Sequence, residues 1–270
     1  MFFTRLISGI VLLVIMIAAM ILGGDVLFFL AALLSFIGLY ELYKTYNIHK
    51  NMLGYLGMGA AVIYVAAVRI QTVAGVEEIT MAGLMTGFLL LMFVYVFTFP
   101  KFKADQAAWA VFGLVYVPVL MMCMYQVRML EDGLFLIPLI FLAAWGNDTC
   151  AYCVGRLIGR HKMAPVLSPK KSVEGAVGGI VGAVILGLIY GYFLMRYLPS
   201  FDTPVFVYGI ICGVGALIAT VGDLAASAIK RNLGIKDYGK LIPGHGGVLD
   251  RFDSILFTAP VVYFLGLFIG

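Results

Sequence analysis

The chain has few charged residues: Asp, Glu, Lys and Arg make up 12% of its 270 residues, against about a quarter in soluble domains. Hydrophobic residues make up 63%. This balance excludes an ordinary soluble domain and indicates a membrane protein, in which about nine spans of roughly 20 residues would leave no room for a separate soluble domain. The net charge of +4 gives no reason to expect a nucleic-acid partner.

Cysteine is also scarce, with four residues and no disulfide framework. Cys150 and Cys153 form a C-x-x-C, but no second pair of Cys or His completes a zinc set, so we interpret them as packing residues. The sequence has no G-x-x-x-x-G-K-[ST] phosphate loop and no convincing signal-peptide cleavage site.

Long apolar runs predict an all-α, polytopic membrane helix bundle of about nine transmembrane helices. We expect an N-terminal part over 1–130, with about five helices, and a C-terminal catalytic part over 131–270. The expected spans lie near 6–22, 26–43, 53–75, 79–99, 108–127, 133–152, 173–197, 205–229 and 254–270.

Basic residues set the expected orientation, because cytoplasmic loops carry the Lys/Arg excess. A cytoplasmic N-terminus and an outside C-terminus put all of them on the inner side except Arg69, Arg128 and Arg196. In the span 173–197, a small residue recurs every fourth position, which predicts a close helix-packing face.

Two polar segments, 147–174 and 227–253, are expected as loops on the cytoplasmic side and together hold ten of the 18 basic residues. Positive-inside topology alone would not require the carboxylates that are mixed among these cations.

Carboxylates in and just before these segments predict a metal site. Asp223 shares one helix face with Ser227 and Lys230, in a span where an unpaired charge is costly. Asp250 and Asp253 are three residues apart at the start of the last span. With Asp148 as a further candidate, these oxygen ligands suit Mg²⁺.

Cations near these carboxylates are suited to holding a polyanionic substrate. Glycines around His245 permit close backbone approach to phosphate, and the ring itself is a candidate phosphate ligand or proton carrier. The combination indicates phosphoryl or nucleotidyl transfer. The candidate cations are Lys170, Lys171, Lys230, Arg231, Lys236 and Arg251.

The second segment resembles a known signature. It contains Ser227-Ala228-Ile229-Lys230-Arg231, Lys236-Asp237-Tyr238-Gly239 and the run from Ile242 to Asp253. This pattern resembles that of the phosphatidate cytidylyltransferases, also called CDP-diacylglycerol synthases. Asn147-Asp148, Ser168-Pro169-Lys170-Lys171 and Glu174-Gly175 resemble a second region of that family, although Ser172-Val173 stands where relatives usually carry Thr-Trp.

The resemblance implies a dimeric enzyme of the bacterial inner membrane, with its active site facing the cytoplasm among membrane lipids. It would convert CTP and phosphatidic acid to CDP-diacylglycerol and pyrophosphate, with Mg²⁺ and a second, monovalent cation such as K⁺.

Roles for single residues follow from this reaction. Asp223, Asp250 and Asp148, with Asp253, would hold metal, and Lys230 would act beside them. Ser227 and His245 would contact substrate. Lys170, Lys171, Lys230 and Arg231 would hold the triphosphate, while Lys236 and Arg251 would hold the lipid phosphate.

Two other functions remain open from the sequence. A CTP-dependent polyprenol or phytol kinase would release CDP instead of pyrophosphate. A cation-coupled transporter would use Asp223 as an intramembrane ion site, although it would not need so many loop cations.

Overall fold

The computed structural model describes residues 2–198 and 203–269. Within these residues, the chain forms nine continuous helical stretches, in agreement with the predicted all-α bundle. Seven of these stretches are each a single α-helix: α1 (Phe2–Leu22), α2 (Gly24–Thr45), α3 (Met52–Ala74), α4 (Ile79–Phe97), α9 (Val173–Tyr197), α10 (Val205–Asn232) and α11 (Leu249–Gly266). The other two are compound: α5 (Ala104–Leu114), η1 (Val115–Val119) and α6 (Leu120–Arg128), then α7 (Gly133–Phe141), η2 (Leu142–Gly146) and α8 (Asn147–Ile158).

Seven of the stretches in the described part of the chain are long and apolar enough to cross a membrane, from α2 through α10. The apolar part of α1, Leu6–Leu22, is shorter. Apolar side chains cover much of the outer surface of these helices, for example Phe29 and Phe93. A lipid environment accounts for this exposure, because lipid tails solvate such side chains as well as a protein core does.

Two compound helices contain π-helical segments. Pro118 lies within η1, and Pro138 lies in α7, shortly before η2. Proline lacks the N–H that an α-helix interior requires, so the helix must adjust nearby. The η2 segment ends directly before Asn147 and Asp148, where the polar part of the helix begins.

The first polar segment is less irregular than predicted, because Asn147–Ile158 forms helix α8. Its Cys150, Ala151 and Val154 pack against glycines of α9. The rest of the segment contains a short antiparallel hairpin of β1 (Lys162–Ala164) and β2 (Ser168–Ser172). Likewise α10 runs on to Asn232, so the second loop spans only 233–248.

The chain divides into two compact units. The first unit contains 1–129 and 237–251, and the second contains 130–236 and 252–270. The loop 237–248 therefore groups with the N-terminal helices and not with the C-terminal part.

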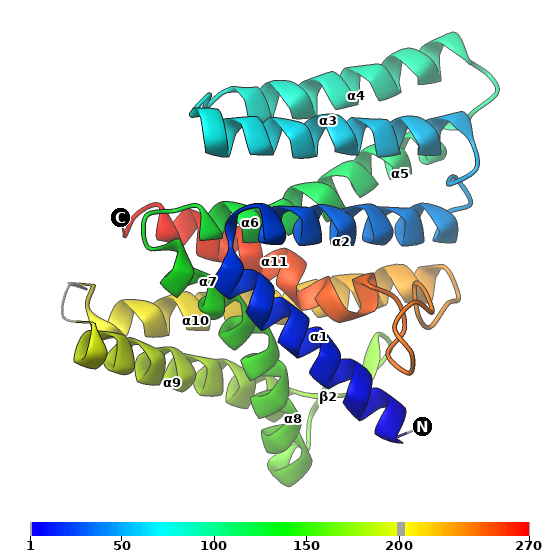
Figure 1. The fold of residues 1–270 in the computed structure, drawn as a ribbon. Coiled ribbons are helices and arrows are strands. Elements are labelled where there is room, and N and C mark those ends of the chain that lie inside the picture. The colour runs from blue at the N-terminus through cyan, green and yellow to red at the C-terminus, as the bar shows by residue number, and fades with distance from the viewer. Residues whose placement is uncertain (1, 199–202, 270) are drawn as a thin grey trace. The chain divides into compact units, whose positions relative to one another are not determined.

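Close helix contacts through small residues hold each unit together. In the first unit, α3 and α4 lie side by side (Figure 1), and Gly83 and Gly87 of α4 face Ala67 and Ala60 of α3. In the second, α9 packs against both α8 and α10. The small residues of α9 are buried, which confirms the predicted packing face: Gly175, Gly179, Ala183, Gly187 and Gly191.

We expect Gly187→Ala to destabilise the second unit. The new Cβ would lie 2.5 Å from the carbonyl oxygen of Tyr208 and 2.9 Å from Cβ of Cys212, so α9 and α10 would have to separate. The free energy of unfolding in detergent should fall by about 1–3 kcal/mol.

The matched control is Gly59→Ala in α3, where nothing lies within 4 Å of the added carbon. Alanine favours a helix over glycine, so this variant should be as stable as the wild type or slightly more so. Equal thermal unfolding of the two variants would contradict the packing role of Gly187.

Candidate active site

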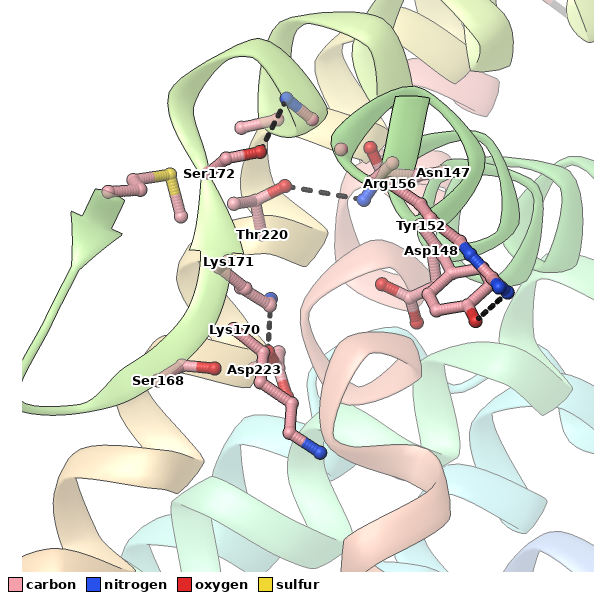
Figure 2. A pocket seen from close by; sticks show the side chains of 15 residues that line it. Asn147, Asp148, Tyr152, Arg156, Ser168, Lys170, Lys171, Ser172, Thr220 and Asp223 are labelled. Atoms are coloured by element: carbon pink, nitrogen blue, oxygen red, sulfur yellow. Dashed lines mark hydrogen bonds and ion pairs between the residues drawn. The ribbon is translucent and has the colours of Figure 1, made fainter. Parts of the chain in front are cut away.

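A polar pocket of about 500 Å³ lies in the second unit. Its walls come from α8, the β1–β2 hairpin, the first turn of α9 and the middle of α10. Figure 2 shows Lys171 and Asp223 meeting on one side, while Asp148, Tyr152 and Arg156 project from α8 on the other. Both carboxylates and cations therefore line one cavity.

Glycines bring the walls of the pocket close together. A Cβ on Gly175 of α9 would lie 2.8 Å from the carbonyl oxygen of Ala151 and 3.1 Å from Cα of Gly155, both in α8. The hydroxyl of Ser172 caps α9 by accepting a hydrogen bond from the N–H of Gly175 at 3.1 Å. The start of α9 and the end of β2 are thereby fixed against α8.

Glu174 fastens the base of the hairpin. Its carboxylate accepts hydrogen bonds from the backbone N–H groups of Arg160, at 3.1 Å, and His161, at 3.2 Å. The same carboxylate pairs with the His161 ring. These contacts hold the backbone just before β1 against the start of α9, at the end of the hairpin where β2 runs into the helix.

The central ion pair joins Lys171 of β2 to Asp223 of α10. Both side chains are partly buried, with exposed fractions of 29% and 25%. Asp253, in the second turn of α11 and almost fully buried, interacts electrostatically with Asp223, Lys230 and Asp148. Two of the predicted metal-binding carboxylates, Asp223 and Asp148, thus lie within electrostatic range of a third, Asp253.

Among the described residues, no three His, Cys, Asp or Glu side chains are arranged as a ready-made metal-binding group. The positive charge beside Asp223 comes from the ammonium of Lys171. Asn147, next to Asp148 in α8, is buried and donates a 3.3 Å hydrogen bond to Thr220 of α10. This bond links the two helices that carry Asp148 and Asp223.

The other predicted carboxylate, Asp250, belongs to the first unit. Its Oδ2 accepts hydrogen bonds from the backbone N–H of Tyr238, at 2.8 Å, and of Gly247, at 2.9 Å. Between these residues, the chain turns sharply at Gly244 and Gly246, which have positive φ angles of 76° and 95°. A side chain at Gly246 would also meet Asp250, so glycine is needed there.

A buried carboxylate on α2 supports the same loop from the other side. Glu41 is 6% exposed and accepts hydrogen bonds from the N–H groups of Val248, at 3.1 Å, and Leu249, at 3.0 Å. Gly239 and Gly247 lie directly against it, where any side chain would collide with its carboxylate. Glu41 therefore caps the N-terminus of α11, and the two N–H groups in turn help to compensate the buried charge of its carboxylate.

His245 is engaged by helix α1 of the same unit. Its Nδ1 lies 2.8 Å from the hydroxyl of Ser8, which also donates a hydrogen bond to the carbonyl of Pro243. Arg251 donates from Nε to the carbonyl oxygen of His245 at 2.9 Å. The ring and the guanidinium are thus both tied to the turn at Gly244.

Comparison with known proteins adds to this geometry. A model of the cytidylyltransferase family matches residues 3–269. The chain belongs to the cytidylyltransferase family.

Bacterial members of this family are similar along nearly the whole chain. The chain is 33% identical to the phosphatidate cytidylyltransferase of Staphylococcus saprophyticus, over 97% of both chains. The enzymes of the same name from Staphylococcus epidermidis and Staphylococcus haemolyticus are 33% and 32% identical with the same coverage. The family expected from two short motifs is therefore confirmed.

In this member of the cytidylyltransferase family, some of the predicted site residues lie together. Asp148, Lys170, Lys171 and Asp223 line the pocket, and Asp253 interacts electrostatically with its two carboxylates and with Lys230. Ser227 and Arg231 follow on α10, and Lys236 lies in the loop after it, outside the pocket lining. The predicted residues that belong to the first unit are Asp250, Arg251 and His245.

Glu41 was missed by the sequence analysis. It lies in a predicted apolar span, and an ionisable residue at such a position is itself a signal, because a lone charge there is costly. Its partners are more than 200 positions away, and no local pattern indicates them.

We expect Glu41→Ala to lower the free energy of unfolding by about 2–4 kcal/mol, because two buried N–H groups would lose their acceptor. Glu41→Gln should cost less, since it keeps one acceptor oxygen. The control is Glu78→Ala, whose exposed side chain makes no capping hydrogen bond to α4. If chemical unfolding in detergent gave the same midpoint for all three, the capping role of Glu41 would be wrong.

Proposed function

We propose that this chain transfers the cytidylyl group of CTP to phosphatidic acid, giving CDP-diacylglycerol and pyrophosphate. The observation that carries the proposal is a pocket lined by both carboxylates and lysines, in a chain that is similar to phosphatidate cytidylyltransferases over nearly its whole length. A water-soluble nucleotide and a lipid phosphate are both polyanions, and this pocket offers them cations at the ends of apolar helices.

The bond changes of the proposed reaction are simple. An oxygen of the phosphatidate phosphate forms a bond to the α-phosphorus of CTP, and the bond from that phosphorus to the β-phosphate oxygen breaks. The nucleophile is an anion at neutral pH, so no strong general base is needed. The protein would act mainly by positioning the reactants and neutralising charge.

The donor set of the pocket fits Mg²⁺, which prefers carboxylate oxygens, water and phosphate oxygens. Asp223 would hold the ion together with Asp148, and Asp253 lies within electrostatic range of both. Bound there, Mg²⁺ would neutralise phosphate charge as a Lewis acid.

The lysines of the hairpin have a separate task. Lys170 and Lys171 lie on β2, whose C-terminal end is fixed by Ser172 and by the Glu174 contacts beside it. They would hold the triphosphate and stabilise the charge that develops on departing pyrophosphate. We further propose that this pocket faces the cytoplasm, where CTP is found.

The reaction can be tested with purified protein, phosphatidic acid and CTP labelled at the α-phosphate. We expect the label in a lipid product, one pyrophosphate released for each liponucleotide formed, and loss of both when EDTA removes divalent metal. Release of CDP together with a phosphorylated alcohol, when polyprenol is supplied, would instead identify a lipid kinase.

Asp223→Asn should lower turnover by about two to three orders of magnitude, because one charged ligand of the metal and phosphate site is lost. The control is Asp105→Asn, the same change on an exposed carboxylate at the start of α5, which should keep wild-type turnover. Near-normal activity of Asp223→Asn in folded protein would reject the role of this carboxylate.

A further inference from the structure

The ion pair between Lys171 and Asp223 joins two residues that the proposed function uses for different purposes. Asp223 would hold metal, while Lys171 would hold phosphate. In the structure the two side chains satisfy each other inside a half-buried pocket. Metal and ammonium therefore compete for the same carboxylate.

Movement of the lysine side chain alone is enough to free Asp223 for a metal ion. Lys171 lies in β2, and the C-terminal end of this strand is fixed by the cap that Ser172 makes to α9. At the same end of the hairpin, Glu174 holds the backbone at Arg160 and His161, just before β1. A lysine has a long, flexible stem, so its ammonium can leave Asp223 without movement of the strand.

A displaced ammonium needs a new partner, because an unpaired charge in a partly buried pocket is costly. The triphosphate of a nucleotide in the same cavity would supply one. Neutralisation of Asp223 by a metal ion would at the same time remove the repulsion between that carboxylate and the phosphates. Both effects act in the same direction.

We propose that Lys171 exchanges partners during substrate binding. It neutralises Asp223 while the pocket lacks metal, and it turns to the nucleotide triphosphate once a divalent ion occupies the carboxylate. Metal and nucleotide then bind with positive coupling, since each favours the lysine position that the other requires. This inference rests on the proposed function, whose pocket and ligands it uses.

The first test measures divalent metal binding without nucleotide. Mn²⁺ takes the same oxygen ligands as Mg²⁺ and can be followed by electron paramagnetic resonance of the purified protein in detergent. We expect Lys171→Gln to bind Mn²⁺ about fivefold more tightly than wild type, because no ion pair has to be broken. Competition with Mg²⁺ alone should show the same ratio.

The matched control is Lys170→Gln, which removes the same charge from the neighbouring residue of β2 and from the same pocket. It should change Mn²⁺ affinity by less than about twofold, since a screened, more distant charge contributes little. Equal effects of the two variants would overturn the exchange, because they would show only a general loss of positive charge. Asp223→Asn should abolish the tight Mn²⁺ site.

The second test measures CTP binding in EDTA, and it does not depend on how Lys171→Gln behaves toward metal. Asp223→Asn should bind metal-free CTP more tightly than wild type, because Lys171 is released and a repelling carboxylate is lost. The Asp223→Asn, Lys171→Gln double variant should lose most of that gain, as a double-mutant cycle would report. A gain of equal size in the double variant would contradict the proposal.

The outcomes separate this inference from the proposed reaction. If metal and CTP show the expected coupling but the labelled product is not a liponucleotide, the exchange holds and the assigned reaction fails. If the liponucleotide forms while Lys171→Gln leaves both binding equilibria unchanged, the reaction stands and the exchange fails. If Mn²⁺ binds no variant with or without CTP, the metal site and the exchange fail together.

Discussion

Carboxylates in an apolar helix bundle need positive partners, and this constraint shapes the polar parts of the chain. Glu41 lies inside an apolar helix and accepts hydrogen bonds from two backbone N–H groups. Asp250 accepts hydrogen bonds from two other backbone N–H groups, and Asp223 forms an ion pair with Lys171. In each case the partner comes from the loop 237–248, from the first residue of α11 or from the hairpin.

Glu41 and Asp250, whose partners are backbone N–H groups, stabilise the fold. Asp223, whose partner is a side chain, can change partner when a ligand binds. Backbone N–H groups cannot leave Glu41 or Asp250 unless the loop itself unfolds. A lysine side chain can leave Asp223 by rotating about its own bonds, while the strand stays in place. Asp223 is therefore the carboxylate that is stabilised without a ligand and still accessible to one.

Features that depend on residues close together in the sequence could be predicted from it. The spans follow from the lengths of apolar runs, and the packing face of α9 follows from small residues at every fourth position. The shape of the polar segments could not be predicted, because α8 is stabilised by packing on α9 and its own sequence reads as polar. The sequence predicts that Asp223 needs a partner in an apolar span, but its lysine partner comes from a hairpin more than 50 residues earlier.

The packing of α9 sets the positions of two helices that carry carboxylates of the pocket. Inside a bilayer, apolar side chains gain little from leaving lipid for protein, so helices associate through close backbone contact. The glycine face of α9 allows such contact with α8 and α10 at once, and these two helices carry Asp148 and Asp223. The separation of the two carboxylates therefore depends on residues that have no side chain. A methyl group added to α9 would displace the acidic residues without touching them, which makes the spacing of the site a property of helix packing.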